Sequence, residues 1–325
     1  MFLDALWFSL GVTLPTILML ILGIVLYRRQ MIDDHFCHTA SKFVFNITLP
    51  CLLFINIVKQ PADYGSQLWL VSAGVVGTMA VYLGGEWLAA RYIAKREHRG
   101  IFVQGIFRGN SGILGLALCV NAYGTAATAP ASVYVACLTL LFNVLAVITL
   151  TYSLGDGKLN GGKMLASLAK NPLILAILCG LIVSKFEITI PVPLIRTGDY
   201  LAHITLPLAL ICTGASLDFS QLKQIKTQPS ADTLNQIVIY SSLGRLFLTP
   251  IVMILLGKYL FQLEPMALGI LFLMSSTPVA VASYAMVRSF GGNATAAANL
   301  IAITTVGAMF TSSLGLLILR QLHWI

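Results

Sequence analysis

Two stretches of this sequence place polar and helix-breaking residues inside apolar segments. Phe107–Gly115 holds an arginine, an asparagine and three glycines within nine residues. Ser275–Pro278 is a run of three hydroxyl residues followed by a proline. Glycine permits unwound backbone, and proline removes a helical hydrogen bond. Each stretch therefore predicts a break inside a helix, although either break alone is also compatible with a simple kink.

The two breaks together predict an anion site. After the first break the helix would restart near Asn110 or Ser111, and after the second it would restart at Pro278 with Thr277 as its cap. Helix N-termini offer free N–H groups and a partial positive charge. Arg108 adds a full charge, so a carboxylate is the simplest ligand. The predicted substrate-binding residues are Arg108, Gly109, Asn110, Ser111, Gly112, Ser276, Thr277 and Pro278.

Arg108 also has an alternative role. It lies about eight residues from the inner end of its apolar segment, and a long basic side chain at that depth can extend to the lipid phosphate groups. The sequence leaves both roles open.

Five more polar residues inside apolar segments are candidates for coupling or structure. A charge in the membrane costs at least about 2.5 kcal/mol unless it is paired or hydrated, so Glu86 and Arg245 predict an internal ion pair, with a proton relay at Glu86 as the alternative. Asp199 and His203 are four residues apart and share a helix face. His203 is expected to hydrogen-bond between helices or to titrate near neutral pH, and Asn46 to hydrogen-bond between helices.

The composition requires a membrane protein with several spans. Of 325 residues, 58% are hydrophobic and 10% are charged, and the mean hydropathy is +0.87, whereas soluble domains have about 25% charged residues. Apolar windows of about 20 residues predict ten transmembrane helices. They are Leu6–Tyr27, Ser41–Val58, Leu68–Ala90, Gly100–Val120, Ala131–Leu154, Leu173–Ile190, Leu194–Leu217, Ile237–Tyr259, Met266–Val287 and Ala294–Leu319.

The distribution of basic residues predicts the orientation. With the N-terminus outside, thirteen of the 20 Lys and Arg residues lie at inner ends and loops and five at outer ones; the other two are Arg108 and Arg245. Basic residues on short loops favour the inner side, so both termini are expected outside the cytoplasmic (inner) membrane. The net charge of +8 is then a topology signal, and no nucleic-acid partner is expected.

An internal repeat divides the predicted spans into two fives. Ile47–Pro50 in the second span recurs as Ile204–Pro207 in the seventh, with Pro50 and Pro207 as helix-break positions. An odd number of spans per half inverts the second half, and paired interruptions in corresponding spans indicate a transporter's binding site. The expected units are residues 1–155, a flexible cytoplasmic linker at 156–171, and residues 172–325.

The sequence lacks the motifs of an enzyme. It contains no H-E-x-x-H, G-x-S-x-G or G-x-x-x-x-G-K-[ST] motif. The six cysteines form no C-x-x-C pair. Neither catalysis, nor a cofactor, nor a metal site is expected.

With these motifs the chain resembles the auxin efflux carrier family, in the short-loop microbial branch of permeases that includes malonate and malate carriers. The residues that carry the resemblance are Asn46–Pro50 with Phe54, Gly109–Leu116, Asn171–Pro172, Leu206–Leu210, Gly214–Leu217 and Pro278–Gly291. Family members usually have a proline where this chain has Ala117, so the position of the first break is less certain.

The resemblance implies an all-α fold of the sodium/proton-antiporter type, with ten transmembrane helices as two inverted five-helix repeats. Helices one, two, six and seven would form a scaffold that dimerises. Helices three to five and eight to ten would form a transport domain, in which helices four and nine are broken and cross. The resemblance further implies an elevator-like shift and a role for Asn110 in contacting the substrate carboxylate, with Pro278 at the second break.

Three functions remain open on the sequence. The leading prediction is a secondary transporter, or permease, for a small organic anion such as a mono- or dicarboxylate. A cation carrier of the same fold, coupled to sodium or protons through Glu86 and Asp199, is the second. A membrane sensor that does not transport is the third. The direction of transport and the coupling ion are not determined by the sequence.

Overall fold

The protein is described by a computed structural model that covers residues 2–59, 64–154, 172–216 and 231–325. Within these ranges every named element is helical, and one isolated antiparallel bridge joins Gly109 to Val279. The predicted linker at residues 156–171 lies outside the described residues.

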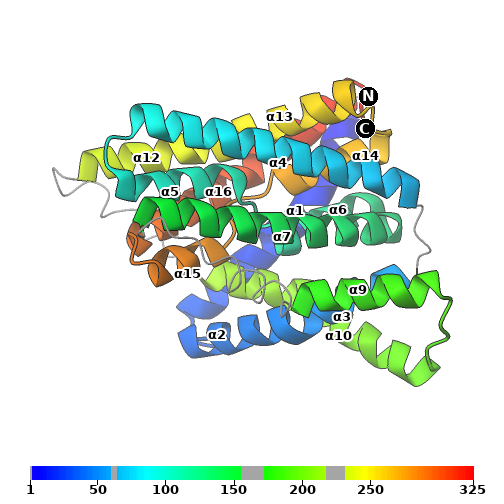
Figure 1. The fold of residues 1–325 in the computed structure, drawn as a ribbon. Coiled ribbons are helices and arrows are strands. Elements are labelled where there is room, and N and C mark those ends of the chain that lie inside the picture. Colours follow the sequence, from blue (N-terminus) through cyan, green and yellow to red (C-terminus); the bar gives the residue numbers. More distant parts are fainter. Residues whose placement is uncertain (1, 60–63, 155–171, 217–230) are drawn as a thin grey trace.

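The first part of the chain forms the helices drawn from blue to green in Figure 1. They are α1 (Phe2–Arg28), α2 (Asp34–Phe43), the π-helix η1 (Val44–Thr48), α3 (Leu49–Lys59), α4 (Tyr64–Tyr92), α5 (Arg96–Phe107), the π-helix η2 (Ser111–Gly115), α6 (Leu116–Tyr123), the 3-10 turn η3 (Gly124–Ala127) and α7 (Thr128–Leu154).

The second part of the chain continues with shorter and more interrupted helices. They are α9 (Pro172–Lys185), α10 (Val192–Ala215), α12 (Ala231–Leu243), the π-helix η5 (Gly244–Leu248), α13 (Thr249–Leu255), the π-helix η6 (Leu256–Leu260), α14 (Pro265–Ser275), α15 (Ala282–Ser289) and α16 (Ala294–Gln321).

Six helical segments in the described ranges are long and apolar enough to cross a membrane. They are Leu3–Arg28, Asp34–Lys59, Gln67–Tyr92, Ser111–Leu154, Leu234–Leu260 and Ala294–Gln321. The sequence predicts ten spans, and the two sets differ in four places. Predicted spans four and five overlap the single segment Ser111–Leu154, and α10, with 24 residues, is not among the six. Helices α5, α9, α14 and α15 have only 12, 14, 11 and 8 residues, fewer than the roughly 20 that cross a bilayer core.

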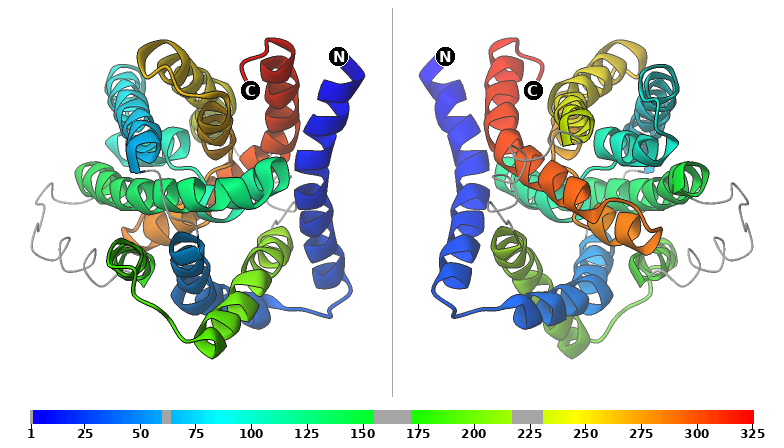
Figure 2. Two further views of the ribbon diagram at one scale, coloured as in Figure 1. Left: turned by 90° about the vertical axis from the view of Figure 1, so that its right-hand side faces the viewer. Right: turned by 90° about the vertical axis from the view of Figure 1, so that its left-hand side faces the viewer.

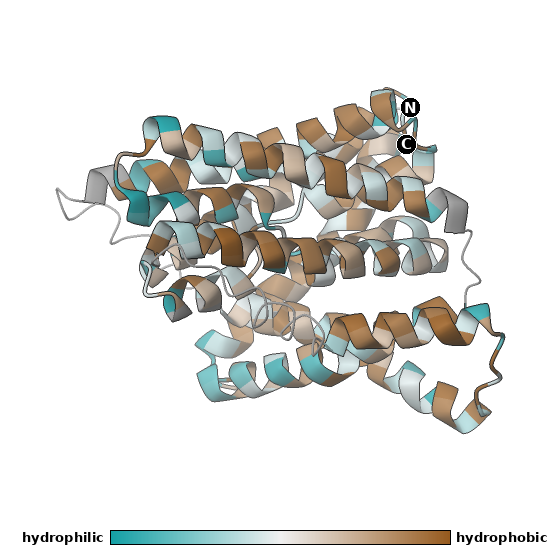
Figure 3. Cartoon of the chain, in the orientation of Figure 1, coloured by the Kyte–Doolittle hydropathy of each residue, from teal (hydrophilic) through white to brown (hydrophobic). Residues whose placement is uncertain are grey.

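The surface of the bundle supports an integral membrane protein. Large apolar side chains such as Trp7, Trp87 and Phe310 are exposed, and hydrophobic colours cover much of the helices in Figure 3, with hydrophilic colours at ends such as the start of α2 and of α5. The two termini lie side by side at one end of the molecule (Figures 1 and 2), where the Arg320 guanidinium lies 4.0 Å from the centre of the Phe8 ring.

The helices pack in two groups. Helix α1 packs along α10, and α3 packs against both α9 and α10. Helices α4, α5 and α7 pack together, and α12 packs against α5 and α16. Figures 1 and 2 show the α2, α3, α9 and α10 group below the remaining helices, with α1 running alongside both.

Glycines bring the backbones of α1 and α10 into direct contact. A Cβ atom on Gly23 would lie 2.1 Å from the carbonyl oxygen of Ile211, and one on Gly214 would lie 2.1 Å from that of Leu20. No side chain fits at either position without moving a helix. At these two positions α1 and α10 are in backbone contact, and α1 contacts α6 and α16 through side-chain hydrogen bonds.

Candidate functional site

The two predicted breaks lie side by side and bond to each other. Helix α5 ends at Phe107 and α14 ends at Ser275. Between the half-helices, the Asn110 N–H donates to the Pro278 carbonyl at 2.8 Å, and the Ala280 N–H donates to the Arg108 carbonyl at 3.1 Å. Backbone polar groups in a membrane need partners within the protein. Each break supplies part of what the other one lacks.

The second break is longer than predicted. Helix α15 begins at Ala282, so Pro278 is not a first helical residue and Thr277 does not cap the helix that follows. Instead, the Thr277 hydroxyl donates to the Met274 carbonyl at 2.9 Å and closes the end of α14. The prediction fails here because residues 278–280 pair with the first break as extended chain and cannot also be helical.

Arg245 binds the ends of both first half-helices. Its side chain is 1% exposed. Nε donates to the Thr277 carbonyl at 2.7 Å, and Nη1 donates to the carbonyls of Ile106 and Phe107 at 3.3 and 3.1 Å. Helix C-termini carry partial negative charge and unpaired carbonyls. Arg245 therefore neutralises the two helix ends that meet at the crossing.

Gly109 leaves the space that Arg245 needs. A Cβ atom at position 109 would lie 2.0 Å from Nη2 of Arg245 and 2.6 Å from the hydroxyl oxygen of Thr277. The guanidinium thus lies directly against the bare backbone of the first break. Arg108, the residue before Gly109, bonds instead to Asn143 and Met286.

The predicted ion pair between Glu86 and Arg245 is wrong. Arg245 is occupied by backbone carbonyls and by the Thr277 hydroxyl, 3.0 Å from its Nη2. Glu86 instead accepts a hydrogen bond from the Thr149 hydroxyl on α7. The spacing of residues in the sequence does not show that the carbonyls at the end of α5 are left unpaired by the break and bind a cation.

Arg108 is buried on the other face of the crossing. Its side chain is 5% exposed, with Nη2 donating to Oδ1 of Asn143 at 2.7 Å and Nη1 lying 2.5 Å from the Met286 sulfur. Both partners are neutral, and the ion pairs found in the described ranges do not involve Arg108. The guanidinium lies between α7 and α15. Of the two predicted roles, this geometry favours a charge inside the protein over extension of the side chain to the lipid phosphate groups.

Asn110 has an unsatisfied side chain. It is 7% exposed, and its Nδ2 is buried without a hydrogen-bond partner among the described residues. It stands just before the helix that runs from η2 into α6, but its side chain makes no capping bond. In the same ranges, the backbone N–H groups of Ser111, Gly112 and Ile113 have no acceptor either. The N-terminus of this half-helix is therefore open to an acceptor.

Ala117 lies in regular helix and not at the break. It is buried within α6, and the chain leaves helical conformation only at residues 108–110, before Ser111. The π-helical turn η2 and Gly109 accommodate the interruption without the proline that family members usually carry. The uncertainty over the position of the first break is thereby removed.

The other predicted residues have structural partners. Ser276 receives a hydrogen bond from the Ser312 hydroxyl at 3.1 Å. Asn46 is exposed and donates to the Lys42 carbonyl four residues earlier, and it makes no hydrogen bond to another helix among the described residues. Pro50 is the second residue of α3, directly after η1, whereas Pro207 lies inside α10.

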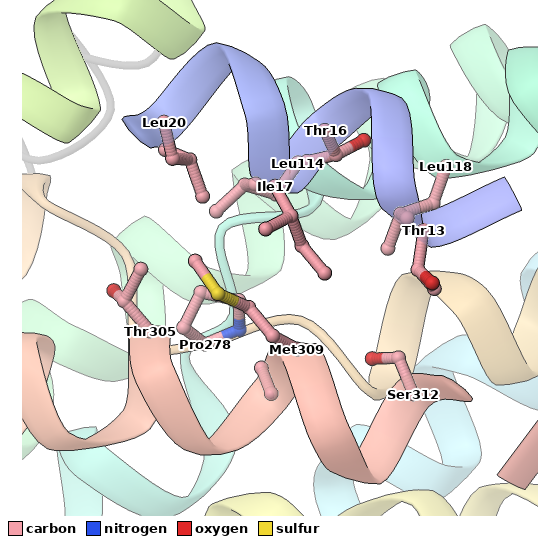
Figure 4. A pocket seen from close by; sticks show the side chains of 11 residues that line it. Thr13, Thr16, Ile17, Leu20, Leu114, Leu118, Pro278, Thr305, Met309 and Ser312 are labelled. Atoms are coloured by element: carbon pink, nitrogen blue, oxygen red, sulfur yellow. The ribbon is translucent and has the colours of Figure 1, made fainter. Parts of the chain in front are cut away.

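Two cavities lie near the crossing. The smaller one, about 20 Å³, is enclosed by α1, α6, α16 and Pro278 (Figure 4), and has room for about one water molecule. The larger one, about 470 Å³, lies between α1, α3, α6 and α10. Asp199 and His203 both line it, and Asp199 pairs with Lys59, a partner that the sequence did not indicate.

The comparison with known proteins decides the class. The sequence pattern of a family described as membrane transport protein matches residues 8–156 and 158–315. The chain belongs to this family. The resemblance to auxin efflux carriers drawn from the motifs is thereby confirmed, and so is the general expectation of a transporter in a lipid bilayer.

Relatives match this chain over its whole length or over about two thirds of it. The uncharacterized transporter YfdV of Escherichia coli (strain K12) is 24% identical over 324 residues, which cover 96% of this chain and 98% of that protein. YfdV of Shigella flexneri matches to the same extent. An uncharacterized transporter of Methanothermobacter thermautotrophicus is 23% identical over 217 residues, covering 66% of this chain and 70% of that protein.

Asn143 and Met286 were missed as residues of the site. Asn143 is an amide inside an apolar segment, which more often joins helices, and Met286 has no feature that separates it from other apolar residues. A possible signal was the position of Arg108 itself, since a buried guanidinium requires acceptors on the helices packed around it.

Proposed function

We propose that the protein is a secondary transporter that binds a small organic anion, a mono- or dicarboxylate, at the crossing of the two breaks. The observation that supports this most is that the first break carries both Arg108 and Asn110, two residues apart and both buried. One is a buried cation without an acidic partner in the described ranges, and the other has a buried amide nitrogen without a hydrogen-bond partner there. A carboxylate has the charge and the acceptors that both lack.

The binding mode follows from the donors available. The carboxylate would accept hydrogen bonds from Nδ2 of Asn110 and from the open N–H groups of Ser111 and Gly112. Its negative charge would be balanced by the guanidinium of Arg108. Charge-assisted hydrogen bonds of this kind are the stronger ones in proteins. Arg245, Thr277 and Pro278 would hold the crossing without contacting the ligand.

The architecture supports an alternating-access proposal. Helices α1, α3, α9 and α10, which correspond to predicted spans one, two, six and seven, would form the scaffold and the dimer contact. The helices that carry the two breaks would form the transport domain and move in an elevator-like shift. The proposal includes ten spans in two inverted repeats, with both termini outside the inner membrane.

Uptake into proteoliposomes tests the proposal. Labelled malonate, malate and oxalate should be transported by the wild-type protein, and Asn110→Ala and Arg108→Ala should each reduce uptake at equal reconstitution. Arg288→Ala, at an exposed arginine on α15, is the matched control. If none of the three anions is transported or bound by the wild-type protein, the anion assignment is wrong.

Coupling to protons is the part of the proposal that Glu86 supports. It is a half-buried carboxylate whose recorded hydrogen bond comes from the neutral Thr149 hydroxyl. Asp199, the other candidate for a cation carrier, is occupied by Lys59. The arrangement favours an anion carrier with Glu86 as the proton-binding residue over a sodium carrier.

A further inference from the structure

The larger cavity is separate from the crossing. About 470 Å³ in volume, it is lined by α1, α3, α6, α10 and the start of α7, and includes neither Arg108 nor Asn110. Small-molecule sites commonly occupy about 300–1,000 Å³, with mostly apolar walls and a few polar groups that orient the ligand. This cavity has that character: Met19, Leu52 and Leu206 contribute apolar walls, and Lys59, Asp199 and His203 are the ionisable groups.

The ion pair in this cavity is of a kind that exchanges easily. Lys59 Nζ lies 2.7 Å from both carboxylate oxygens of Asp199. The Lys59 side chain is 46% exposed and the Asp199 side chain 25%. Partly exposed pairs add little net stability because water and ions screen them. Another carboxylate can therefore replace Asp199 on Lys59 at small cost.

A second nitrogen group lies beside the pair. His203 is one helical turn after Asp199 on α10, and both residues line the cavity. Asn56 lines it from α3 and donates its Nδ2 to the Ser132 hydroxyl, which directs its amide toward α7. Lys59 on α3 and His203 on α10 are therefore the nitrogen groups that remain for an anion in the cavity.

The cavity also adjoins the half-helix that starts at the crossing. Leu116 and Ala117 of α6 form part of its wall. Ala117 is six residues beyond Ser111, or about 9 Å along a helix. A ligand in the cavity would therefore have to move by only about 9 Å to reach the open N–H groups at the crossing.

We infer that this cavity is a second carboxylate-binding site, an antechamber in which an incoming carboxylate displaces Asp199 from Lys59. The apolar walls would contact the carbon skeleton of the ligand. The inference rests on the proposed function, because it is the transported anion that would wait there. In this view, Asp199 is a built-in competitor that keeps the affinity of the antechamber low enough for the anion to move on.

Opposite effects of the two partners test this inference. Binding of malonate and of benzoate is measured by calorimetry on the full-length protein in nanodiscs. Asp199→Asn removes the competitor and should tighten binding by up to about fivefold. Lys59→Met removes the cation and should weaken binding by about tenfold. Lys185→Met, an exposed lysine at the end of α9, is the matched control and should change nothing.

The outcomes separate this site from the crossing. One outcome is that Asp199→Asn and Lys59→Met both weaken binding, or both leave it unchanged, while Asn110→Ala abolishes it. In that case the ion pair only holds α3 against α10, and the inference of a second site is wrong. If Lys59→Met weakens binding and Asp199→Asn tightens it while Asn110→Ala has no effect, the antechamber stands and the crossing site is wrong. If the wild-type protein binds neither anion, both proposals are overturned.

Discussion

Arg245 and Thr277 are joined twice, from Nε to the Thr277 carbonyl at 2.7 Å and from Nη2 to its hydroxyl at 3.0 Å. The same guanidinium also binds the last carbonyls of α5. One side chain from η5 therefore fixes the two interrupted helices relative to each other. Arg108, the other buried arginine at the crossing, donates to Oδ1 of Asn143 instead.

Replacement of Arg245 should destabilise the whole protein. Arg245→Met leaves the buried carbonyls of Phe107 and Thr277 without their donor, whereas the Ile106 carbonyl keeps the Thr249 hydroxyl. Each unsatisfied buried group costs about 1–3 kcal/mol, so we expect a loss of about 2 kcal/mol or more, seen as a lower unfolding temperature in detergent. Arg245→Lys should rescue only part of it, because an ammonium cannot reproduce the planar fork. An unchanged unfolding temperature in Arg245→Met would contradict this role, and Arg288→Met, at an exposed position, is the control.

Gly109→Ala should be as damaging as the loss of Arg245. The added methyl would meet Nη2 of Arg245 at 2.0 Å, so either the guanidinium or the break must move. Gly112→Ala is the matched control, since a Cβ there would meet only Val135 at an ordinary contact distance of 3.6 Å. Thermal unfolding of both variants in the same detergent should show a large loss for Gly109→Ala and little change for Gly112→Ala. Equal losses would show that the space at Gly109 is not the reason for the glycine.

Much of the crossing could be predicted from residue types. Glycines beside Arg108 and the hydroxyl run before Pro278 break helical hydrogen bonding wherever they stand, so both breaks follow from local chemistry. The start of the half-helix near Ser111 follows in the same way. These features depend only on residues that are adjacent in the sequence, so one sequence is enough to predict them.

The partners of the charged residues could not be predicted, because they depend on packing. Pairing Arg245 with Glu86 is the simplest way to pair two buried charges on the sequence. In the structure, the backbone carbonyls left unpaired by the breaks bind Arg245 instead. The start of α15 was misplaced for a related reason. Pro278 favours the first turn of a helix, yet the pairing of its carbonyl with Asn110 holds that segment extended.

Glu86→Gln should remove proton dependence and leave anion binding intact. The amide keeps the size of the side chain and can still accept from the Thr149 hydroxyl, so the fold is expected to hold. We expect malonate uptake to lose its response to an imposed pH gradient while its affinity changes less than about twofold. Thr149→Val, which removes only the hydrogen bond, is the companion variant. Uptake by Glu86→Gln that still follows the pH gradient would exclude Glu86 as the coupling residue.

Asn110→Asp distinguishes an anion site from a cation site. Arg108 and Asn110 are two residues apart in the first break, so a carboxylate at position 110 would be a nearby counterion, which Arg108 lacks in the described ranges. An external carboxylate would then meet a neutralised site and a negative charge, and we expect its binding to fall by at least about tenfold, the effect of one lost charge-assisted hydrogen bond. The unfolding temperature should stay the same or rise, because the buried guanidinium gains an ionic partner. Calorimetry with malonate and thermal unfolding measure the two effects on one sample. If the site binds cations, the added carboxylate should instead strengthen the binding of sodium, and malonate should have no measurable affinity for either protein.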